Sequence, residues 1–357
     1  MLGEGFPSAR LAEPVVVPER EKTARMKRAT IYSIAEELGV HPSTVSRAFS
    51  RPELVKASVR ERIMATADRL GYAPNRTARG LATGRTGLIG LLVPDITNPF
   101  FPPLVRAIER AARDREAGVL LVDADARGAA EPGLIRQLRS EVDGLVVASP
   151  RAPSAKLKDA VSGMPTVVLN RTVRGLPSVV CDNGTALREA AEQLRRDGHR
   201  RFALLRGPAS SWAARRRAQA VHQWAASADG VEVVELGPFE AQFEDARSAG
   251  PDIVASGATA VLAFDDLMAC GVVAGLAEQG VAVPDDVSVL GCDDVLLART
   301  MTPALSTVTA PLQELGEHAV AMLVAVASGE RVRDERVEGV LTLRGTTAPV
   351  KGAAASG

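Results

Sequence analysis

From residue 88 onward, short apolar runs alternate with helical stretches, and this alternation constrains the fold more than any other feature. The runs have strand length and are rich in Val, Ile and Leu, at 88–93, 119–122, 144–147, 166–169, 202–205, 231–234, 260–264 and 287–290. Helices are expected between them, at 102–115, 186–196, 211–226 and 267–279. Apolar strands separated by helices form parallel sheets covered on both faces. The length of this part of the chain suits two such sheets better than one.

The first 85 residues differ from the remainder in charge. They contain 15 Lys and Arg against 9 Asp and Glu, whereas residues 86–357 contain 28 against 34. A basic module with an excess of +6 therefore precedes an acidic body with an excess of −6. A small basic module indicates a polyanionic partner, although an excess of this size is also common on solvated surfaces.

Several classes of protein are not expected from this sequence. No run of 18 apolar residues is present, so we expect no membrane span. Residues 1–28 lack an apolar segment before a cleavage site, which makes them a disordered leader rather than an export signal, with Met26 as an alternative start. Cys181, Cys270 and Cys292 have no CxxC spacing and fit reduced thiols. We therefore expect a cytoplasmic protein.

Motifs for catalysis are missing as well. The sequence has no phosphate-binding glycine loop of the GxxxxGK[ST] type, no GxSxG and no HExxH. We therefore expect no catalytic residues, no metal site and no cofactor, and the protein is not expected to be an enzyme.

Residues 29–72 have the pattern of three short helices. Thr30 is suited to cap the first helix, which ends at a glycine, and Pro42 is suited to the first position of the second. Ser58 and Glu61 have the spacing of a capping box, which predicts the start of the third helix. Two helices joined by a tight glycine-containing turn are typical of a helix-turn-helix.

The second of these helices carries side chains suited to base recognition. Short hydroxyls and a cation near a helix N-terminus can reach base edges and phosphates in the major groove. Ser43, Thr44, Ser46 and Arg47 supply these groups. A helical hairpin with an ordinary polar face is the alternative at this point.

Four motifs in a fixed order resemble the lactose-repressor (LacI/GalR) family of bacterial transcription regulators. They are TVSR at 44–47, GYAPN at 71–75, Leu81 and TGRTGLIGLLVPDITNPFF at 83–101, and the resemblance extends over residues 30–343. It implies a hinge helix within a linker at 73–85, whose leucine inserts into the minor groove and bends the operator. The candidate DNA-binding residues are then Thr30, Tyr32, Ser33, Pro42, Ser43, Thr44, Ser46, Arg47, Asn75, Arg76, Ala78 and Leu81.

The resemblance also implies an effector-binding and dimerisation domain at 86–345, followed by a tail at 346–357. Its fold is that of periplasmic sugar-binding proteins, with a ligand cleft between two α/β subdomains. In such clefts polar side chains bind hydroxyls, and aromatic rings pack on the apolar face of the sugar. The candidate effector-binding residues are Asn98, Phe100, Phe101, Asn170, Arg171, Ser211, Arg215, Phe239, Asp265 and Asp293. As alternatives, the two phenylalanines at 100 and 101 belong to the core, and Asp265 or Asp266 caps the next helix.

The predicted architecture is an all-α helix-turn-helix module and hinge helix joined to an α/β periplasmic-binding-protein-like domain of two parallel-sheet subdomains. The predicted function is that of a DNA-binding repressor. It is expected to act as a homodimer on a near-palindromic operator, and a sugar-like effector is expected to set its affinity. A periplasmic-type sugar-binding protein, a sugar-processing enzyme, and a family regulator controlled by a partner protein or corepressor remain alternatives. Ala310 and Asn170 replace the family's usual Gln and Asp, so the identity of the effector stays open.

Overall fold

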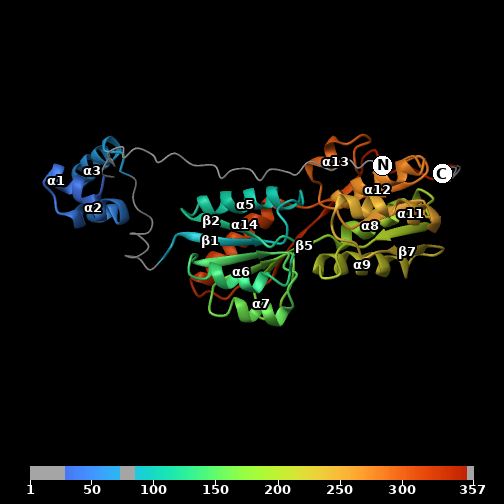
Figure 1. Cartoon of the computed structure of the whole chain (residues 1–357), viewed down its shortest axis with the longest axis horizontal. Coiled ribbons are helices and arrows are strands. Elements are labelled where there is room, and N and C mark those ends of the chain that lie inside the picture. The colour runs from blue at the N-terminus through green and yellow to red at the C-terminus, as the bar shows by residue number, and fades with distance from the viewer. Residues whose placement is uncertain (1–28, 73–84, 352–357) are drawn as a thin grey trace, which may run out of the picture. The chain divides into compact units, whose positions relative to one another are not determined.

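The computed structural model describes residues 29–72 and 85–351. The chain divides into two compact units, Met1–Arg79 and Gly80–Gly357. Figure 1 labels the elements of both units. In the described part of the chain, no helix is long and apolar enough to cross a membrane.

The first unit is a cluster of short helices around a small apolar core. Its elements are α1 (Ile31–Leu38), α2 (Pro42–Ser50), a 3₁₀ turn (Pro52–Leu54) and α3 (Ala57–Arg69). Ile34, Val45 and Ile63, one from each α-helix, are fully buried at its centre. Each helix is too short to be stable alone, so this shared core holds the three together.

The caps of these helices agree with the sequence at α1 and differ at α3. The Thr30 hydroxyl accepts from the Ser33 backbone N–H, and the Ser33 hydroxyl accepts from the Thr30 N–H, which is a capping box. The predicted capping box of Ser58 and Glu61 is wrong. The helix begins at Ala57, one residue before Ser58, and its N-cap residue makes no side-chain capping hydrogen bond.

The second unit contains two parallel sheets. The first has the strand order β11-β5-β4-β3-β1-β2 and all its pairs are parallel. Its strands are β1 (Leu88–Val93), β2 (Gly118–Asp123), β3 (Gly144–Ala148), β4 (Thr166–Leu169), β5 (Ser178–Asp182) and β11 (Glu335–Glu338). Helices α5 (Phe101–Arg113) and α14 (Leu312–Ala327) cover one face, and α6 (Glu131–Leu138) and α7 (Ser154–Ala160) cover the other (Figure 1). We call this the first subdomain.

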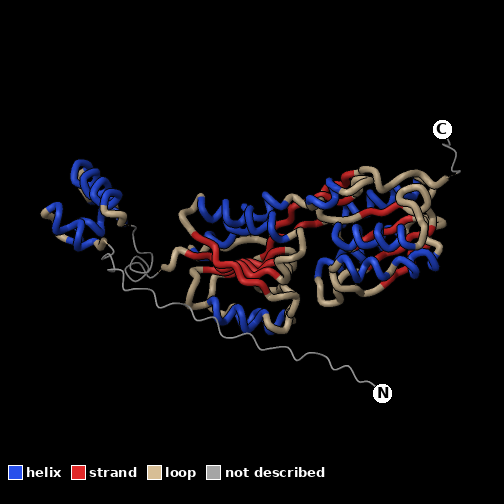
Figure 2. The backbone as a smooth tube through the Cα atoms, turned by 45° about the horizontal axis from the view of Figure 1, so that its top comes forward, coloured by secondary structure: helices blue, strands red, loops and turns tan. Residues whose placement is uncertain are grey.

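The second subdomain has a four-stranded parallel sheet of order β7-β6-β8-β9. Its strands are β6 (Arg201–Leu205), β7 (Glu232–Leu236), β8 (Ala260–Ala263) and β9 (Ser288–Leu290). One face packs against α8 (Gly184–Arg196) and α9 (Trp212–Ala225). The other packs against α10 (Phe243–Ser248), α11 (Gly250–Ser256), α12 (Asp266–Glu278) and α13 (Leu296–Thr300). Figure 2 shows the strands of both sheets enclosed by helices.

The chain crosses between the two subdomains after β5, after β10 (Thr307–Thr309) and between β11 and β12 (Val340–Thr342). Strands β10 and β12 pair antiparallel beside the crossings. A Cβ on Gly339 would lie 2.3 Å from the Asn183 Oδ1 and 2.9 Å from a Val308 methyl group. Only glycine fits there, because the three crossing segments pack closely. Since these segments join the two subdomains, they must bend or twist when the subdomains move relative to each other.

The prediction of two parallel-sheet subdomains is confirmed, and each predicted strand has an observed counterpart. The boundary of the predicted tail at residue 346 is too early. Thr346 is fully buried, and its hydroxyl accepts from the Ser306 N–H and donates to the Val289 carbonyl. Residues just past 345 therefore belong to the second subdomain.

Candidate functional site

In the first unit, the candidate DNA-binding residues of α2 lie around its solvent-facing side. Val45 and Ala48 point into the core, whereas Ser46 and Arg47 are exposed. Since successive residues of a helix are rotated by about 100°, this burial pattern leaves the opposite face of α2 accessible. Tyr32 on α1 is 67% exposed.

Several of the predicted hydroxyls already have structural partners. Thr30 and Ser33 cap α1, and the Ser43 hydroxyl lies 2.8 Å from the His41 Nδ1 at the start of α2. The same His41 nitrogen accepts from the Ser43 N–H, so His41 is the N-cap of α2, a role that the sequence did not suggest. These contacts fix the first turns of both helices.

The positive charge of the basic module lies mainly outside its three-helix core. Residues 29–72 contain six Lys and Arg and five Asp and Glu. The excess comes from basic residues on both sides of the core, at positions 27, 28, 76, 79 and 85. The candidate residues Asn75, Arg76, Ala78 and Leu81 lie outside the described residues.

In the second unit, a cavity of about 60 Å³, which we call the cleft pocket, lies where the carboxyl ends of the two sheets meet. Seven of the ten predicted effector residues line it: Asn98, Phe100, Phe101, Asn170, Ser211, Asp265 and Asp293. Pockets for small molecules usually have volumes of about 300–1,000 Å³. The cleft pocket is therefore too small in this structure to hold a sugar, and a ligand of that size requires it to widen.

Three residues that line the cleft pocket have left-handed backbone conformations. The φ angles are 47° for Ser149, 57° for Asn170 and 124° for Asp293. Such conformations cost on the order of 1–3 kcal/mol for a residue with a side chain, and they cluster at functional sites. Each of these residues lies just after a parallel strand, which is where α/β folds bind ligands.

A hydrogen bond joins the two subdomains across the cleft pocket. The Asn98 side-chain amide donates to the Asp265 Oδ2 at 3.0 Å, and both side chains are buried. The Asp265 Oδ1 accepts from the Met268 N–H, so Asp265 also caps α12, as the alternative interpretation held. Burial raises the pKa of the Asp265 carboxyl, and these two hydrogen bonds oppose the rise.

A buried ion pair forms another part of the wall. The Arg217 Nη2 lies 2.7 Å from the Asp293 Oδ1, and the guanidinium carbon lies 4.9 Å from the centre of the Phe264 ring. Burial raises the pKa of Asp293, and Arg217 opposes this rise. Arg217 and Phe264 line the pocket but were not among the predicted residues.

The structure brings Arg217 to the cleft pocket rather than Arg215. Arg215 is exposed, and its guanidinium donates to a backbone carbonyl of its own segment. The buried stripe of α9, formed by Ala214, Ala218 and Val221, sets the rotation of the helix. The buried residues of α9 also include Ala220 and Trp224, and at about 100° per residue Arg217 lies within the arc that they span, whereas Arg215 lies outside it. This apolar spacing is the signal that could have identified Arg217 from the sequence.

Arg171 also lies outside the cleft pocket, where it supports one of its loops. It is buried, and its Nη1 donates to the carbonyls of Pro150 at 2.8 Å and Ala152 at 2.7 Å. The buried Glu131 carboxylate accepts from the backbone N–H groups of Arg151 and Ala152. These two side chains fix the loop after β3, which brings Arg151 to the pocket.

The predicted aromatic residues differ in location. Phe100 and Phe101 line the cleft pocket, and they also pack edge-to-face at 5.1 Å within the core of the first subdomain. These two residues therefore line the pocket, as predicted, and also belong to the core, as the alternative held. Phe239 packs against the core of the second subdomain instead of lining the pocket.

Asp266, next to the cleft pocket, should make stability depend on pH. It is fully buried, its Oδ1 accepts from the Thr307 hydroxyl at 2.6 Å, and its Oδ2 accepts from the Val295 N–H at 2.8 Å. Burial raises its pKa from 3.8 to about 6. The folded state therefore holds this proton more tightly than the unfolded state, and the resulting stability is lost as the pH rises through 6.

We expect the free energy of unfolding of the wild type, relative to Asp266→Asn, to fall by about 2–3 kcal/mol from pH 4 to pH 7. Asparagine can donate to the Thr307 hydroxyl and accept from the Val295 N–H, so the variant keeps both contacts without a charge. Urea unfolding over this pH range measures the difference. Parallel pH profiles of the two proteins would contradict the expectation.

Among the described residues, no group of three or more His, Cys, Asp and Glu side chains is arranged to hold a metal ion.

Comparisons with known proteins give matches to both units. A model described as bacterial regulatory proteins, lacI family, matches residues 30–75, and a model of a periplasmic binding protein-like domain matches residues 191–347. The ribose operon repressor of Bacillus subtilis (strain 168) is 30% identical over 322 residues, which cover 89% of this chain and 97% of that repressor.

Solved structures with a similar fold include the Lac repressor dimer bound to operator and the anti-inducer ONPF. Its TM-score is 0.81 at 27% identity, covering 90% of this chain and 100% of the repressor chain. A LacI family transcriptional regulator from Enterococcus faecium with bound ribose has a TM-score of 0.67 at 27% identity, covering 74% of this chain and 100% of that chain.

Proposed function

Since this chain belongs to the lacI family of bacterial regulatory proteins and is a transcriptional repressor of that type, we propose that a sugar-like effector in the cleft pocket sets its affinity for operator DNA. One observation carries the proposal: five of the seven predicted polar effector residues line one small pocket between the two subdomains. The ribose bound by the regulator from Enterococcus faecium supports a sugar as the class of ligand.

The cleft pocket offers the groups that a sugar requires. Asn98, Asp265 and Asp293 carry amide and carboxylate groups for hydroxyls, and Phe100 and Phe264 offer apolar faces. A sugar that binds both side chains would displace the hydrogen bond between Asn98 and Asp265, because the pocket is too small to hold it otherwise. Binding would thus shift the two subdomains about the crossing segments.

We propose that α2 enters the major groove of the operator, with Thr44, Ser46 and Arg47 directed at bases. Thr30, Tyr32, Ser33, Pro42 and Ser43 lie at the starts of α1 and α2, where helix N-termini suit phosphate contacts. Asn75, Arg76, Ala78 and Leu81 belong to a proposed hinge in the linker 73–85. In this proposal the DNA-binding module consists of residues 29–72, and the effector-binding domain begins at residue 86.

The protein is proposed to act as a homodimer on a near-palindromic operator. Two recognition helices related by a two-fold axis match two half-sites about one helical turn apart. The Lac repressor dimer on its operator, which is similar in fold to this chain, supports this assembly.

The experiment is a footprint of the purified protein on the DNA upstream of its own coding sequence, repeated with a panel of sugars and sugar phosphates. We expect a protected palindrome whose protection changes with one member of the panel. Protection that no small molecule alters would keep the DNA-binding function and refute the effector. Absence of any specific protection would refute the proposed use of α2.

A further inference from the structure

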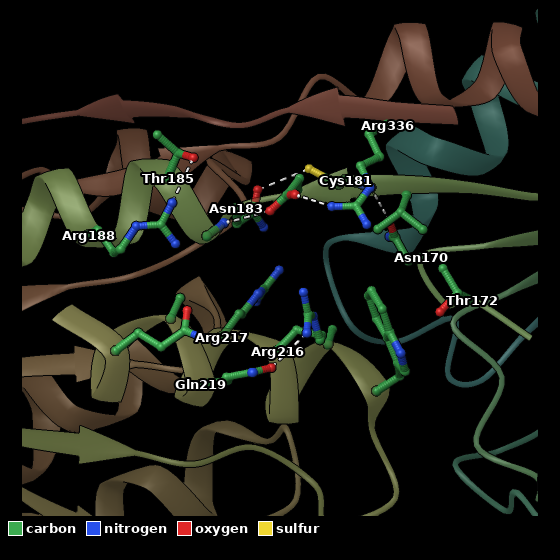
Figure 3. A pocket seen from close by; sticks show the side chains of 17 residues that line it. Asn170, Thr172, Cys181, Asn183, Thr185, Arg188, Arg216, Arg217, Gln219 and Arg336 are labelled. Atoms are coloured by element: carbon green, nitrogen blue, oxygen red, sulfur yellow. Dashed lines mark hydrogen bonds and ion pairs between the residues drawn. The ribbon is translucent and has the colours of Figure 1, made fainter. Parts of the chain in front are cut away.

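A second and larger cavity adjoins the cleft pocket and is lined by arginines. Its volume is about 270 Å³. Arg188 comes from α8, Arg216 and Arg217 come from α9, and Arg336 comes from β11. Figure 3 shows Arg216 and Arg217 pointing from α9 toward the opposite wall, where Asn183 and Arg336 lie. We call this cavity the arginine chamber.

The positive charge of the arginine chamber is only partly neutralised. Arg217 is paired with Asp293, and the Arg336 Nη1 lies 3.0 Å from the Asp182 Oδ2. Among the described residues that line the chamber, Asp182 is the one acid against four arginines. The structure therefore leaves a net positive charge around a space large enough for a small anion.

Two of the arginines have neutral partners. The Arg188 Nη2 donates to the Thr185 hydroxyl at 3.1 Å. The Arg216 Nη1 donates to the Gln219 Oε1 at 2.6 Å, and its guanidinium carbon lies 5.7 Å from the centre of the Trp212 ring. Neither Arg188 nor Arg216 makes an ion pair with another described residue. Each guanidinium therefore retains donors that an anion can use.

The chemistry of these groups favours a phosphoryl group. A guanidinium presents N–H donors in a planar fork that matches two oxygens of a phosphate or carboxylate. Thr172, Thr185 and Gln223 add neutral polar side chains to the lining. Two forks together with these hydroxyls and amides can bind three oxygens around one centre, which a phosphoryl group offers and a carboxylate does not.

The arginine chamber and the cleft pocket are adjacent, since Asn170, Ala213 and Arg217 line both. We propose that the arginine chamber binds the phosphoryl group of a phosphorylated sugar whose hydroxyls occupy the cleft pocket. The effect that this binding would have on operator affinity rests on the proposed function. The binding of phosphate itself is independent of that function.

The first experiment measures calorimetric binding of inorganic phosphate to the full-length protein at constant ionic strength. We expect the wild type to bind it and both Arg188→Gln and Arg216→Gln to bind at least about tenfold more weakly, because each removes a charge-assisted contact. Arg196→Gln is the matched control, because Arg196 is exposed on α8 and lies outside the chamber. Absence of binding, or an equal loss in all three variants, would overturn the proposal.

The second experiment compares sugar phosphates with their parent sugars as modulators of operator affinity. We expect one sugar phosphate to change operator affinity and its parent sugar to have at least about tenfold less effect. In the double variant Arg188→Gln, Arg216→Gln, the sugar phosphate and its parent should have the same effect. A response to parent sugars alone would keep the proposed function and overturn this inference. If the protein binds no operator, the proposed function fails, and the phosphate titration still decides whether the chamber binds anions.

Discussion

Arg217→Ala is expected to abolish the response of operator binding to the effector and to lower the free energy of unfolding of the second unit by about 3–5 kcal/mol. The substitution leaves the Asp293 carboxylate buried without its cation, and breaking a buried pair on one side costs about this much. It also removes the guanidinium that packs on Phe264 in the wall of the cleft pocket. Urea unfolding and operator titrations with and without effector measure the two effects.

Arg215→Ala is the matched control for this variant. Arg215 lies on the same helix, is exposed and is absent from the lining of the cleft pocket. We expect its stability to stay within about 0.5 kcal/mol of the wild type and its effector response to persist. If the Arg215 variant lost the response and the Arg217 variant kept it, Arg215 rather than Arg217 would act in effector binding.

Arg47→Ala is expected to weaken binding to the operator by about 1–3 kcal/mol per half-site, which is about 2–6 kcal/mol for a dimer. Arg47 is exposed on α2, next to the buried Val45 that anchors the helix to the core. A guanidinium in the major groove can pair with one base and discriminate against the others. Random duplex DNA should therefore lose much less affinity. Titrations with both DNAs at one salt concentration measure the difference.

Arg62→Ala serves as the control, because Arg62 is exposed on α3 and is not a candidate base-contacting residue. We expect at most a small loss that is the same for operator and random DNA. If Arg47→Ala also gave equal losses on both DNAs, Arg47 would contact phosphate alone and the proposed base recognition by α2 would be incorrect.

Most of the buried strands could be predicted because they are apolar throughout. Strand β3, for example, is buried along its whole length and has the sequence GLVVA. Strand β5, with the sequence SVVCD and polar residues at both ends, was missed. Strand β11 has the sequence ERVE at the edge of the first sheet, where only Val337 is buried. A strand at an edge leaves most of its side chains in solvent, so its residues carry no apolar pattern that predicts it.

Helix α14 shows a different limit. It lies 130 or more residues after strands β1 to β5 of the sheet that it covers, and a Cβ on its Gly316 would lie 2.7 Å from the Ala107 Cβ of α5. The sequence alone does not indicate that a segment so far along the chain returns to the first subdomain. Only the packing of α5 against α14 makes this clear.

Part of the candidate site could be predicted where a polar residue closely follows a strand. Asn170 and Asp265 are examples, since the ends of parallel strands converge on one edge. Ser149, which lies in this position after β3, was missed. For a residue on a helix, the direction of its side chain depends on the rotation of the helix about its axis. This rotation brings Arg217 to the pocket and leaves Arg215 exposed. Arg171 follows a strand as well, but its long side chain turns back to the carbonyls of Pro150 and Ala152.

The central claim is that effector binding and operator binding are coupled, and a linkage measurement tests it most directly. The affinity of the effector is measured for the free protein and for the protein saturated with operator DNA, and the affinity of the operator is measured with and without effector. We predict that both ratios are the same factor, about 5–150, because coupling between two sites is reciprocal. An effector affinity that is identical with and without operator would contradict the account.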